Sequence, residues 1–352
     1  MSRFLAPLLL TLAPLWAQAE EVISVYNWND YIAPQVLKAF EQETGIRVDY
    51  HTFSNTKEMQ AALRGPAAID VLVPSHNDLP HLIEEGLLQP LDFSRLPNRR
   101  HLDKELLSKL AAVDPGNRYA LPYLWGAVGL AVNLPLAEAA YGGPLPDSWS
   151  LLFDPTQSAR LASCGISVLD APDETLSILL SYQGHSLAHS APSRIKRAGK
   201  VLDALRPNLR YVDSERYIDA LAKGELCVAM AWVGDALGAA AAGQPVRFSV
   251  PQEGSVLFID SLTVPRSARR ADLAQRFIDY LMRPEVAALI TEETLYPSGN
   301  ADAKAFLDAT LRENPGLYPD PASKRRLSAL ETLPEKHIGI RDQVWAGFRD
   351  DR

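Results

Sequence analysis

The sequence has no surplus of basic residues. Its 352 residues include 35 lysines and arginines against 43 aspartates and glutamates, which gives a formal net charge of −8 at pH 7. Proteins that bind nucleic acid contact its phosphates with clustered basic side chains, so we expect no nucleic-acid partner. Hydrophobic residues make up 47% of the chain and charged residues 22%, a composition typical of a folded globular protein. The length suits two domains.

Long apolar runs are lacking outside the N-terminus. There Arg3 precedes an apolar stretch from Phe4 to Trp16, which two prolines interrupt and Ala-Gln-Ala at residues 17–19 follows. This arrangement is typical of a secretory signal peptide and is too short to span a bilayer. We therefore expect cleavage after Ala19 and an exported, soluble mature protein.

Cysteine is also scarce, since Cys164 and Cys227 are the only two. In an exported chain two cysteines most often form one disulfide, because the compartment is oxidising. A pair of buried free thiols is the alternative. No histidine motif accompanies either cysteine, so a catalytic thiol has little support.

The short motifs of common enzyme classes are absent. The sequence contains no G-x-S-x-G, P-loop, G-x-G-x-x-G or D-x-D-x-D-G pattern. His185 and His189 have the spacing of H-E-x-x-H, but the glutamate is missing. A metal site or a glycosidase-type carboxylate pair stays open, because carboxylates alone serve either role.

Strand and helix patterns alternate in the first part of the chain. Strands are predicted at 22–26, 46–53 and 69–74, and helices at about 34–43, at 56–64 and before Gly86. Strands that alternate with helices at this spacing build a parallel sheet of right-handed βαβ units.

A second series of strands and helices follows. Strands are predicted at 127–132, 165–169, 209–212, 226–232, 246–250 and 256–264, and helices near 174–182, 193–205, 214–223 and 235–242. From residue 271 onward the pattern is largely helical. We therefore predict an α/β protein of two lobes. The approximate limits are 20–126 plus 247–297 for lobe 1 and 127–246 plus 298–352 for lobe 2.

Acidic and aromatic residues gather after the predicted strands. They are Trp28, Asp30, Tyr31, Asp78, Asp170, Asp173, Glu174 and Asp235, and Asp260 ends the apolar run VLFID. Ligands of open α/β sheets bind beyond the carboxyl ends of the strands. Carboxylates and ring faces bind ammonium groups, so this pattern favours an organic cation as ligand.

Each of these residues also has a purely structural interpretation. Asp30 and Asp235 are possible helix N-caps, and Asp173 and Glu174 suit the positive end of a helix dipole. The aromatic residues Trp28, Tyr31 and Trp232 are possible core residues. The prediction of a site therefore depends on the coincidence of these residues at strand ends.

Motifs along the whole chain resemble those of periplasmic putrescine/spermidine-binding proteins of ABC transporters. They are YNWNDYIAPQVLKAFEQETGI, VPS at 73–75, LPYLWGAVGLAVN, SCGISVLDAPDE, CVAMAWVGD and RENPGLYP, in this order between Val22 and about Arg341. The resemblance implies a bilobal periplasmic-binding-protein fold (type II) that closes on its ligand by a hinge. It also implies a monomer in the periplasm that delivers its ligand to an inner-membrane ABC permease. No catalysis, cofactor or metal is expected.

The same resemblance implies a set of ligand-binding residues. They are Trp28, Asn29, Asp30, Tyr31 and Ser75 from the first lobe, Glu174, Ser214, Trp232 and Asp235 from the second, and Phe258, Asp260 and Tyr296. Asp235 and Asp260 are the expected ammonium ligands, because these positions carry acids in the family. Cys164 and Cys227 match a cysteine pair that forms a disulfide in putrescine-type relatives.

The chain departs from the family pattern near the expected ligand. Asn29 stands where the family usually has Ser or Thr, and His76 and Asn77 also differ from it. Donors of the Asn29 amide do not suit an ammonium group, although its carbonyl oxygen does. Phe258 matches the putrescine-type pattern, where spermidine-preferring members tend toward Trp. We therefore expect putrescine as ligand. Spermidine, agmatine or another organic cation, or a role as a polyamine sensor, are the alternatives, and an exported carboxylate-based hydrolase is a remote one.

Overall fold

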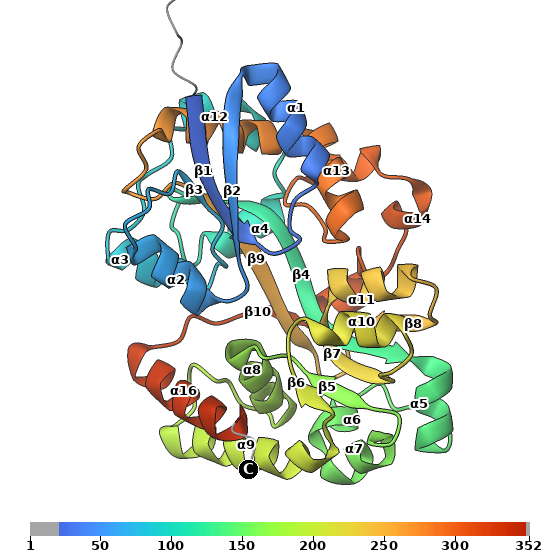
Figure 1. Cartoon of the computed structure of the whole chain (residues 1–352). Helices are drawn as coiled ribbons and strands as arrows, with labels where there is room; N and C mark the ends of the chain where they lie inside the picture. Colours follow the sequence, from blue (N-terminus) through green and yellow to red (C-terminus); the bar gives the residue numbers. More distant parts are fainter. Residues whose placement is uncertain (1–20, 350–352) are drawn as a thin grey trace, which may run out of the picture.

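The computed structural model describes residues 21–349, which form two α/β lobes. Two long strands, β4 (Ala120–Asn133) and β9 (Ser255–Thr263), pass from one lobe to the other (Figure 1). Every residue of both strands is buried, because they contribute to the cores of both lobes. The predicted signal peptide, residues 1–19, lies outside the described residues. None of the helices within residues 21–349 is long and apolar enough to cross a membrane.

The first lobe begins with the predicted parallel sheet. Strand β1 (Glu21–Trp28) lies between β2 (Ile46–Phe53) and β3 (Val71–Leu72) and is parallel to both. The connecting helices are α1 (Pro34–Thr44), α2 (Thr56–Arg64) and, after β3, α3 (Leu79–Glu84). Pro34 opens α1, and Gly45 ends it with a φ of 72°, a left-handed conformation that glycine adopts without strain.

The second lobe is built on a second group of strands. They are β5 (Ile166–Val168), β6 (Tyr211–Val212), β7 (Val228–Trp232) and β8 (Val246–Ser249). The helices packed on them include α8 (Pro172–Tyr182), α9 (Pro192–Leu205), α10 (Arg216–Ala222) and α11 (Val233–Ala241). A disulfide joins Cys164, just before β5, to Cys227, just before β7, which confirms the predicted pair.

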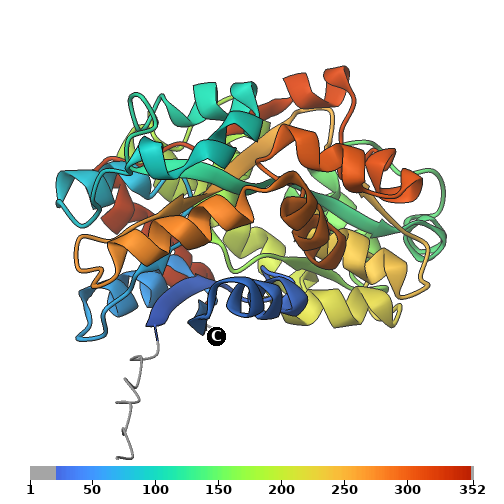
Figure 2. The same ribbon diagram turned by 90° about the horizontal axis from the view of Figure 1, so that it is seen from above.

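One sheet runs through both lobes in the order β2-β1-β3-β9-β4-β7-β5-β6, with β8 paired to β4 and β10 (Leu327–Ala329) to β9. Helices pack on both sides of these strands (Figure 2). The remaining elements are η1 (Phe93–Arg95), η2 (Pro97–His101), α4 (Lys104–Leu110), α5 (Leu134–Tyr141), α6 (Ser150–Phe153), α7 (Pro155–Leu161), η3 (Arg206–Asn208), α12 (Ala271–Leu281), α13 (Pro284–Thr294), η4 (Ala301–Phe306), α14 (Ala309–Arg312), α15 (Pro321–Arg325) and α16 (Glu335–Arg349).

The C-terminal part of the chain divides between the lobes. Ala303 and Leu307 pack against Ala287 and Ala288 of α13, so η4 lies beside this helix. Helix α16, in contrast, packs on α9 in the second lobe (Figure 1). The precise lobe limits stay a prediction. Strand β10 lies in a stretch that we expected to be helical. Its three residues carry only a weak sequence pattern, and pairing with β9 makes them a strand.

Candidate functional site

Asp260 lies in β9 where this strand passes between the lobes. Its two carboxylate oxygens accept hydrogen bonds of 2.7 Å from the Tyr31 and Ser75 hydroxyls. The side chain is buried, with 5% of its surface exposed. The strand predicted at 256–264 is confirmed as β9, so Asp260 lies inside this strand and not at its end, where the run VLFID had placed it. Ser75 forms an isolated bridge with Asp260, which brings it to the same place from the end of β3.

Asp235 lies in the first turn of α11, and tyrosines from both lobes hold it. One oxygen accepts a hydrogen bond from Tyr217 of α10, and the other accepts one of 2.9 Å from Tyr296, which follows α13 in the first lobe. The N-cap of α11 is Trp232, so Asp235 is not the capping residue. Asp235 therefore takes part in a direct contact between the lobes.

Aromatic rings connect these two carboxylates. The ring centroids of Tyr31 and Tyr296 are 5.1 Å apart, and those of Phe258 and Tyr296 are 6.0 Å apart. The Tyr123 hydroxyl donates a 2.7 Å hydrogen bond to the backbone carbonyl of Tyr31 and so holds Tyr31 in place. The result is an apolar wall with a carboxylate at each end, which suits a methylene chain that carries positive groups.

Burial affects the charge of the acids in this region. It raises the pKa of Asp260 to about 7 and that of Asp235 to about 6, although the tyrosine and serine donors act in the opposite direction. Burial also raises the pKa of Tyr31 and Tyr296 well above the usual range, so both remain hydroxyl donors. Ionisation of such carboxyls is costly unless a cation lies nearby. The electrostatics therefore favour a positively charged ligand.

Glu174 approaches the same region from the second lobe. It lies in the first turn of α8, as expected of an acid that suits the helix dipole. Burial, followed by the charge of Asp173, raises its pKa to about 8. Within residues 21–349 no other side chain donates a hydrogen bond to Glu174, whereas Asp173 forms an ion pair with Arg341 of α16. No group of His, Cys, Asp or Glu residues in this part of the chain is arranged to hold a metal ion.

Residues 28–30 lie at the end of β1, next to the second lobe. The Asn29 amide donates hydrogen bonds to Ser54 (2.8 Å) and to Glu215 of the second lobe (3.5 Å), which leaves its carbonyl oxygen as the free acceptor. Asp30 has a φ of 50° and is not a helix cap, because α1 begins at Pro34. The ring centroids of Trp28 and Phe53 are 4.6 Å apart, and the buried Trp28 indole N–H has no hydrogen-bond partner among residues 21–349.

The other expected residues occupy the second lobe and the loop after β3. The Ser214 hydroxyl is buried and has no hydrogen-bond partner in the described part of the chain, and Trp232 packs against the cores of both lobes. His76 is not free to contact a ligand through its Nδ1, because this atom accepts a 3.2 Å hydrogen bond from the amide of Ile259. Burial lowers the pKa of His76 to about 4, so it is neutral.

Sequence reasoning missed several residues of this region. They are Tyr123, Glu215 and Tyr217, together with Asp78, which was noted only as an acid after a strand. Tyr217 lies inside a predicted helix, where no pattern distinguishes it from a core residue. Its partner Asp235 was predicted, but the pairing depends on how α10 packs against α11.

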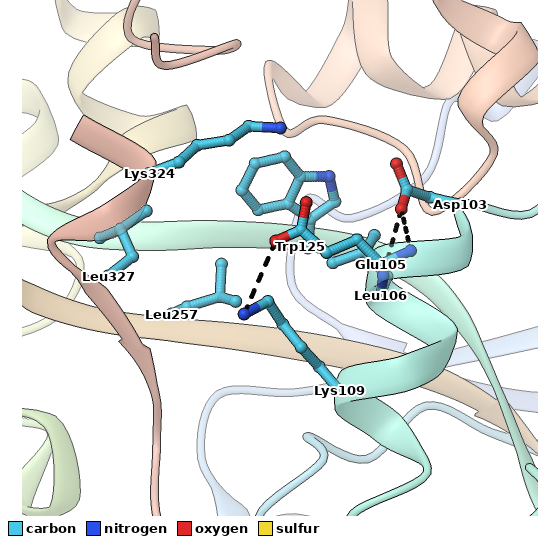
Figure 3. Close-up of a pocket in the computed structure, with 8 residues that line it drawn as sticks. All are labelled: Asp103, Glu105, Leu106, Lys109, Trp125, Leu257, Lys324 and Leu327. Carbon is cyan, nitrogen blue, oxygen red and sulfur yellow. Dashed lines mark hydrogen bonds and ion pairs between the residues drawn. The ribbon is translucent and has the colours of Figure 1, made fainter. Parts of the chain in front are cut away.

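A surface pocket lies on the other face of the sheet (Figure 3). Its lining residues are Asp103, Glu105, Leu106, Lys109, Trp125, Leu257, Lys324 and Leu327. None of these is in the expected ligand set. Leu257 and Asp260 both belong to β9, and residues three positions apart in a strand point to opposite faces, so the pocket and the Asp260 carboxylate lie on opposite sides of the sheet.

Comparisons with known proteins identify the family of this chain. The family model described as bacterial extracellular solute-binding protein matches residues 35–319. The chain is 38% identical to the putrescine-binding periplasmic protein PotF of Escherichia coli, over 96% of this chain and 93% of the relative. It is 40% identical to a putrescine/agmatine-binding protein of Pseudomonas aeruginosa, over 94% of this chain and 92% of the relative.

A solved structure gives the same result for the fold. The putative spermidine/putrescine ABC transporter protein of Listeria monocytogenes superposes with a TM-score of 0.86 at 28% identity, and the match covers 94% of this chain and 100% of that one. The predicted bilobal periplasmic-binding-protein fold is therefore confirmed. The matched relatives are binding proteins, which confirms the prediction of a protein without catalysis. The chain belongs to the bacterial extracellular solute-binding protein family.

Proposed function

We propose that this protein captures a polyamine, with putrescine favoured, in the cleft between its lobes and delivers it to an inner-membrane ABC permease. The observation that carries the proposal is the pair of carboxylates, Asp235 and Asp260, at the two ends of an aromatic wall. Neither forms an ion pair with a lysine or arginine of residues 21–349. Each therefore has charge available for an ammonium group.

A linear amine with a positive group at each end complements both the two carboxylates and the aromatic wall between them. Each ammonium group needs its own charged acceptor once it leaves water, and the two carboxylates supply one at each end. The methylene chain between them packs on Tyr31, Tyr296 and Phe258. The names of the relatives, which refer to putrescine and agmatine, support a ligand of this class.

The remaining expected residues complete the proposed site. They are Trp28, Asn29, Asp30, Ser75, Glu174, Ser214 and Trp232. The proposal includes export to the periplasm with cleavage after Ala19, and a monomeric protein. The first lobe would include η4, because of its packing on α13, and the second would include α16.

Titration calorimetry on ligand-stripped protein tests the proposal. The chain would be unfolded in denaturant, washed and refolded, and then titrated with putrescine, cadaverine, agmatine and spermidine. We expect one-to-one binding of at least one amine. The variants Asp235→Asn and Asp260→Asn should each weaken it at least about 10-fold, because each removes one charged acceptor of an ammonium group.

The matched control is Asp203→Asn, which changes an exposed acid on α9 in the same way and should leave affinity unchanged. Folded protein that binds none of the four amines would contradict the proposed function. Binding that survives both cleft substitutions would show that the assigned site is wrong.

A further inference from the structure

A second hollow, which we call the lysine pocket, adjoins the pocket of Figure 3 and shares Asp103, Trp125 and Lys324 with it. Its other lining residues are Ser298, Asn300, Ala301, Lys304, Tyr318 and Pro319. None of these residues belongs to the proposed amine site. The volume of the lysine pocket is about 200 Å³, the space of about seven water molecules. This is more than one inorganic ion needs and enough for a small organic molecule.

Two lysines of this pocket carry charge that the described chain does not neutralise. The Lys304 ammonium lies 4.2 Å from the centroid of the Tyr318 ring. The Lys324 ammonium lies 5.8 Å from the centroid of the Trp125 ring, and its side chain extends across this ring in Figure 3. Neither lysine forms an ion pair with an aspartate or glutamate of residues 21–349. The two ammonium groups lie over different rings and are therefore two separate positions for negative charge.

Among residues 21–349, Asp103 is the one acid that lines the lysine pocket. Its Oδ1 atom accepts hydrogen bonds from the backbone N–H groups of Glu105 (2.7 Å) and Leu106 (3.1 Å), so this carboxylate caps α4. The positive end of the helix offsets part of its charge. The balance of charge in the pocket is therefore positive.

Two neutral donors of the pocket have no acceptor within the described part of the chain. The Ser298 hydroxyl oxygen accepts a 3.0 Å hydrogen bond from the amide of Asn300, which leaves the hydroxyl hydrogen free to donate. The indole N–H of Trp125 also has no acceptor, although only 9% of this residue is exposed. Donors that are largely removed from water and lack an acceptor favour a ligand that only accepts, as a carboxylate does.

The chain that carries Ser298 is held firmly in place. The Asn300 side chain donates a 2.7 Å hydrogen bond to the Met282 carbonyl and accepts two from backbone N–H groups of η4. A Cβ atom at Gly299 would lie 2.5 Å from the carbonyl oxygen of Pro122, so this segment packs directly on β4. A site whose donors are already fixed loses little conformational freedom when it binds a ligand.

We propose that the lysine pocket binds a small organic dicarboxylate. One carboxylate accepts hydrogen bonds from Lys304 and the other from Lys324, and both interactions are charge-assisted. The Ser298 hydroxyl and the Trp125 indole N–H donate to the remaining carboxylate oxygens. This inference does not depend on the proposed function, because it uses no residue of the amine site.

Calorimetry on the folded protein with malonate, succinate and glutarate tests the inference. An ionic strength of about 0.01 M keeps the screening of exposed charges weak. At least one of these acids should bind one-to-one and at least about 10-fold more tightly than butyrate, whose single carboxylate reaches only one ammonium group. Lys304→Gln and Lys324→Gln should each weaken this binding about 10-fold, because each removes one charged donor.

The matched control is Lys200→Gln, which changes an exposed lysine of α9 in the same way and should leave the affinity unchanged. Nuclear magnetic resonance gives a second readout. The indole N–H resonance of Trp125, identified by its loss in Trp125→Phe, should shift as the dicarboxylate is added.

Two results would overturn the inference. One is the absence of saturable binding for all three dicarboxylates, or binding that both lysine substitutions at the pocket leave unchanged. The other is inorganic phosphate that binds as tightly as the best dicarboxylate, because a single small anion would then account for the site. Neither result bears on amine binding in the cleft.

Discussion

The Tyr296 hydroxyl, in the first lobe, donates a hydrogen bond of 2.9 Å to Asp235 in the second lobe. Tyr217 donates to the other oxygen of the same carboxylate. The carboxylate that is proposed to bind one ammonium group thus also joins the two lobes. Ligand capture and lobe closure are coupled if the ammonium group and the Tyr296 hydroxyl share this acceptor, because each holds Asp235 in place for the other.

The variant Tyr296→Phe distinguishes the contribution of the hydroxyl to binding from that of the ring. The variant keeps the ring contacts with Tyr31 and Phe258 but loses the hydrogen bond between the lobes. Hydrogen bonds to charged groups contribute about 1.5–3 kcal/mol, so we expect the affinity for the amine to fall about 10-fold or more, as measured by calorimetry. Tyr318→Phe is the control, since Tyr318 lines a pocket outside the cleft. Unchanged affinity in Tyr296→Phe would show that this hydrogen bond does not contribute to binding.

Gly234 allows Tyr296 to approach α11 closely. A Cβ atom at residue 234 would lie 2.3 Å from the Tyr296 ring, whereas one at Gly238, one turn further along the same helix, would meet nothing within 4 Å. We expect Gly234→Ala to displace Tyr296 and weaken amine binding strongly. Gly238→Ala should bind normally and unfold at an equal or higher temperature, because alanine favours the helix. Calorimetry and thermal unfolding on the pair distinguish an effect on the cleft from a general effect on α11.

The rule for strand ends explains why part of the site could be predicted. Residues 29–31 and Ser75 follow the parallel strands β1 and β3 of the first lobe. Asp235 follows β7 of the second lobe, which runs in the opposite direction, so the ends of these strands face one another between the lobes. Asp260 reaches the same place from inside β9, which the rule does not cover. Asp78 occupies the start of α3, where the sequence alone cannot show that its side chain makes no capping hydrogen bond.

The limits of the strands could also be predicted only in part. Strand β4 was predicted only at 127–132, but it begins at Ala120 and contains Pro122 and Gly126, residue types that are unfavourable inside a strand. The structure keeps Pro122 at a shift of register in the pairing with β9. At Gly126 a side chain would lie 2.6 Å from the Phe258 ring, so the small residue makes room for the aromatic wall. These features depend on the partner strand and not on the local sequence.

The disulfide should stabilise the second lobe without affecting the cleft. Cys164 and Cys227 precede β5 and β7, whereas Trp232 and Asp235 lie at the opposite end of β7. The separation of 63 residues predicts a loss of about 4 kcal/mol in the free energy of unfolding for the double variant Cys164→Ala/Cys227→Ala. Urea unfolding measures this loss, and calorimetry at 25 °C should give the wild-type affinity. Equal stability of the two proteins would contradict this role.

Protonation of the cleft acids should make stability and binding respond to pH in opposite directions. Burial raises the pKa of Asp260 to about 7 in the folded, ligand-free protein, from an ordinary value of 3.8. Between these values the folded state holds a proton that the unfolded state has lost, so the stability due to this group is full below pH 3.8 and is lost as the pH rises through 7. A bound ammonium group favours the ionised carboxylate, so affinity should instead rise over the same range.

Thermal unfolding and calorimetry at several pH values measure both effects. Asp260→Asn cannot titrate, so the ligand-free variant should lose less stability than the wild type between pH 5 and 8. In the wild type near pH 6, binding should release protons, which calorimetry in buffers of different ionisation enthalpy detects. Proton uptake on binding, or affinity that falls as the pH rises from 5 to 8, would contradict an ammonium ligand at Asp260, because protonation of the carboxyl and binding of a cation compete for the same oxygens.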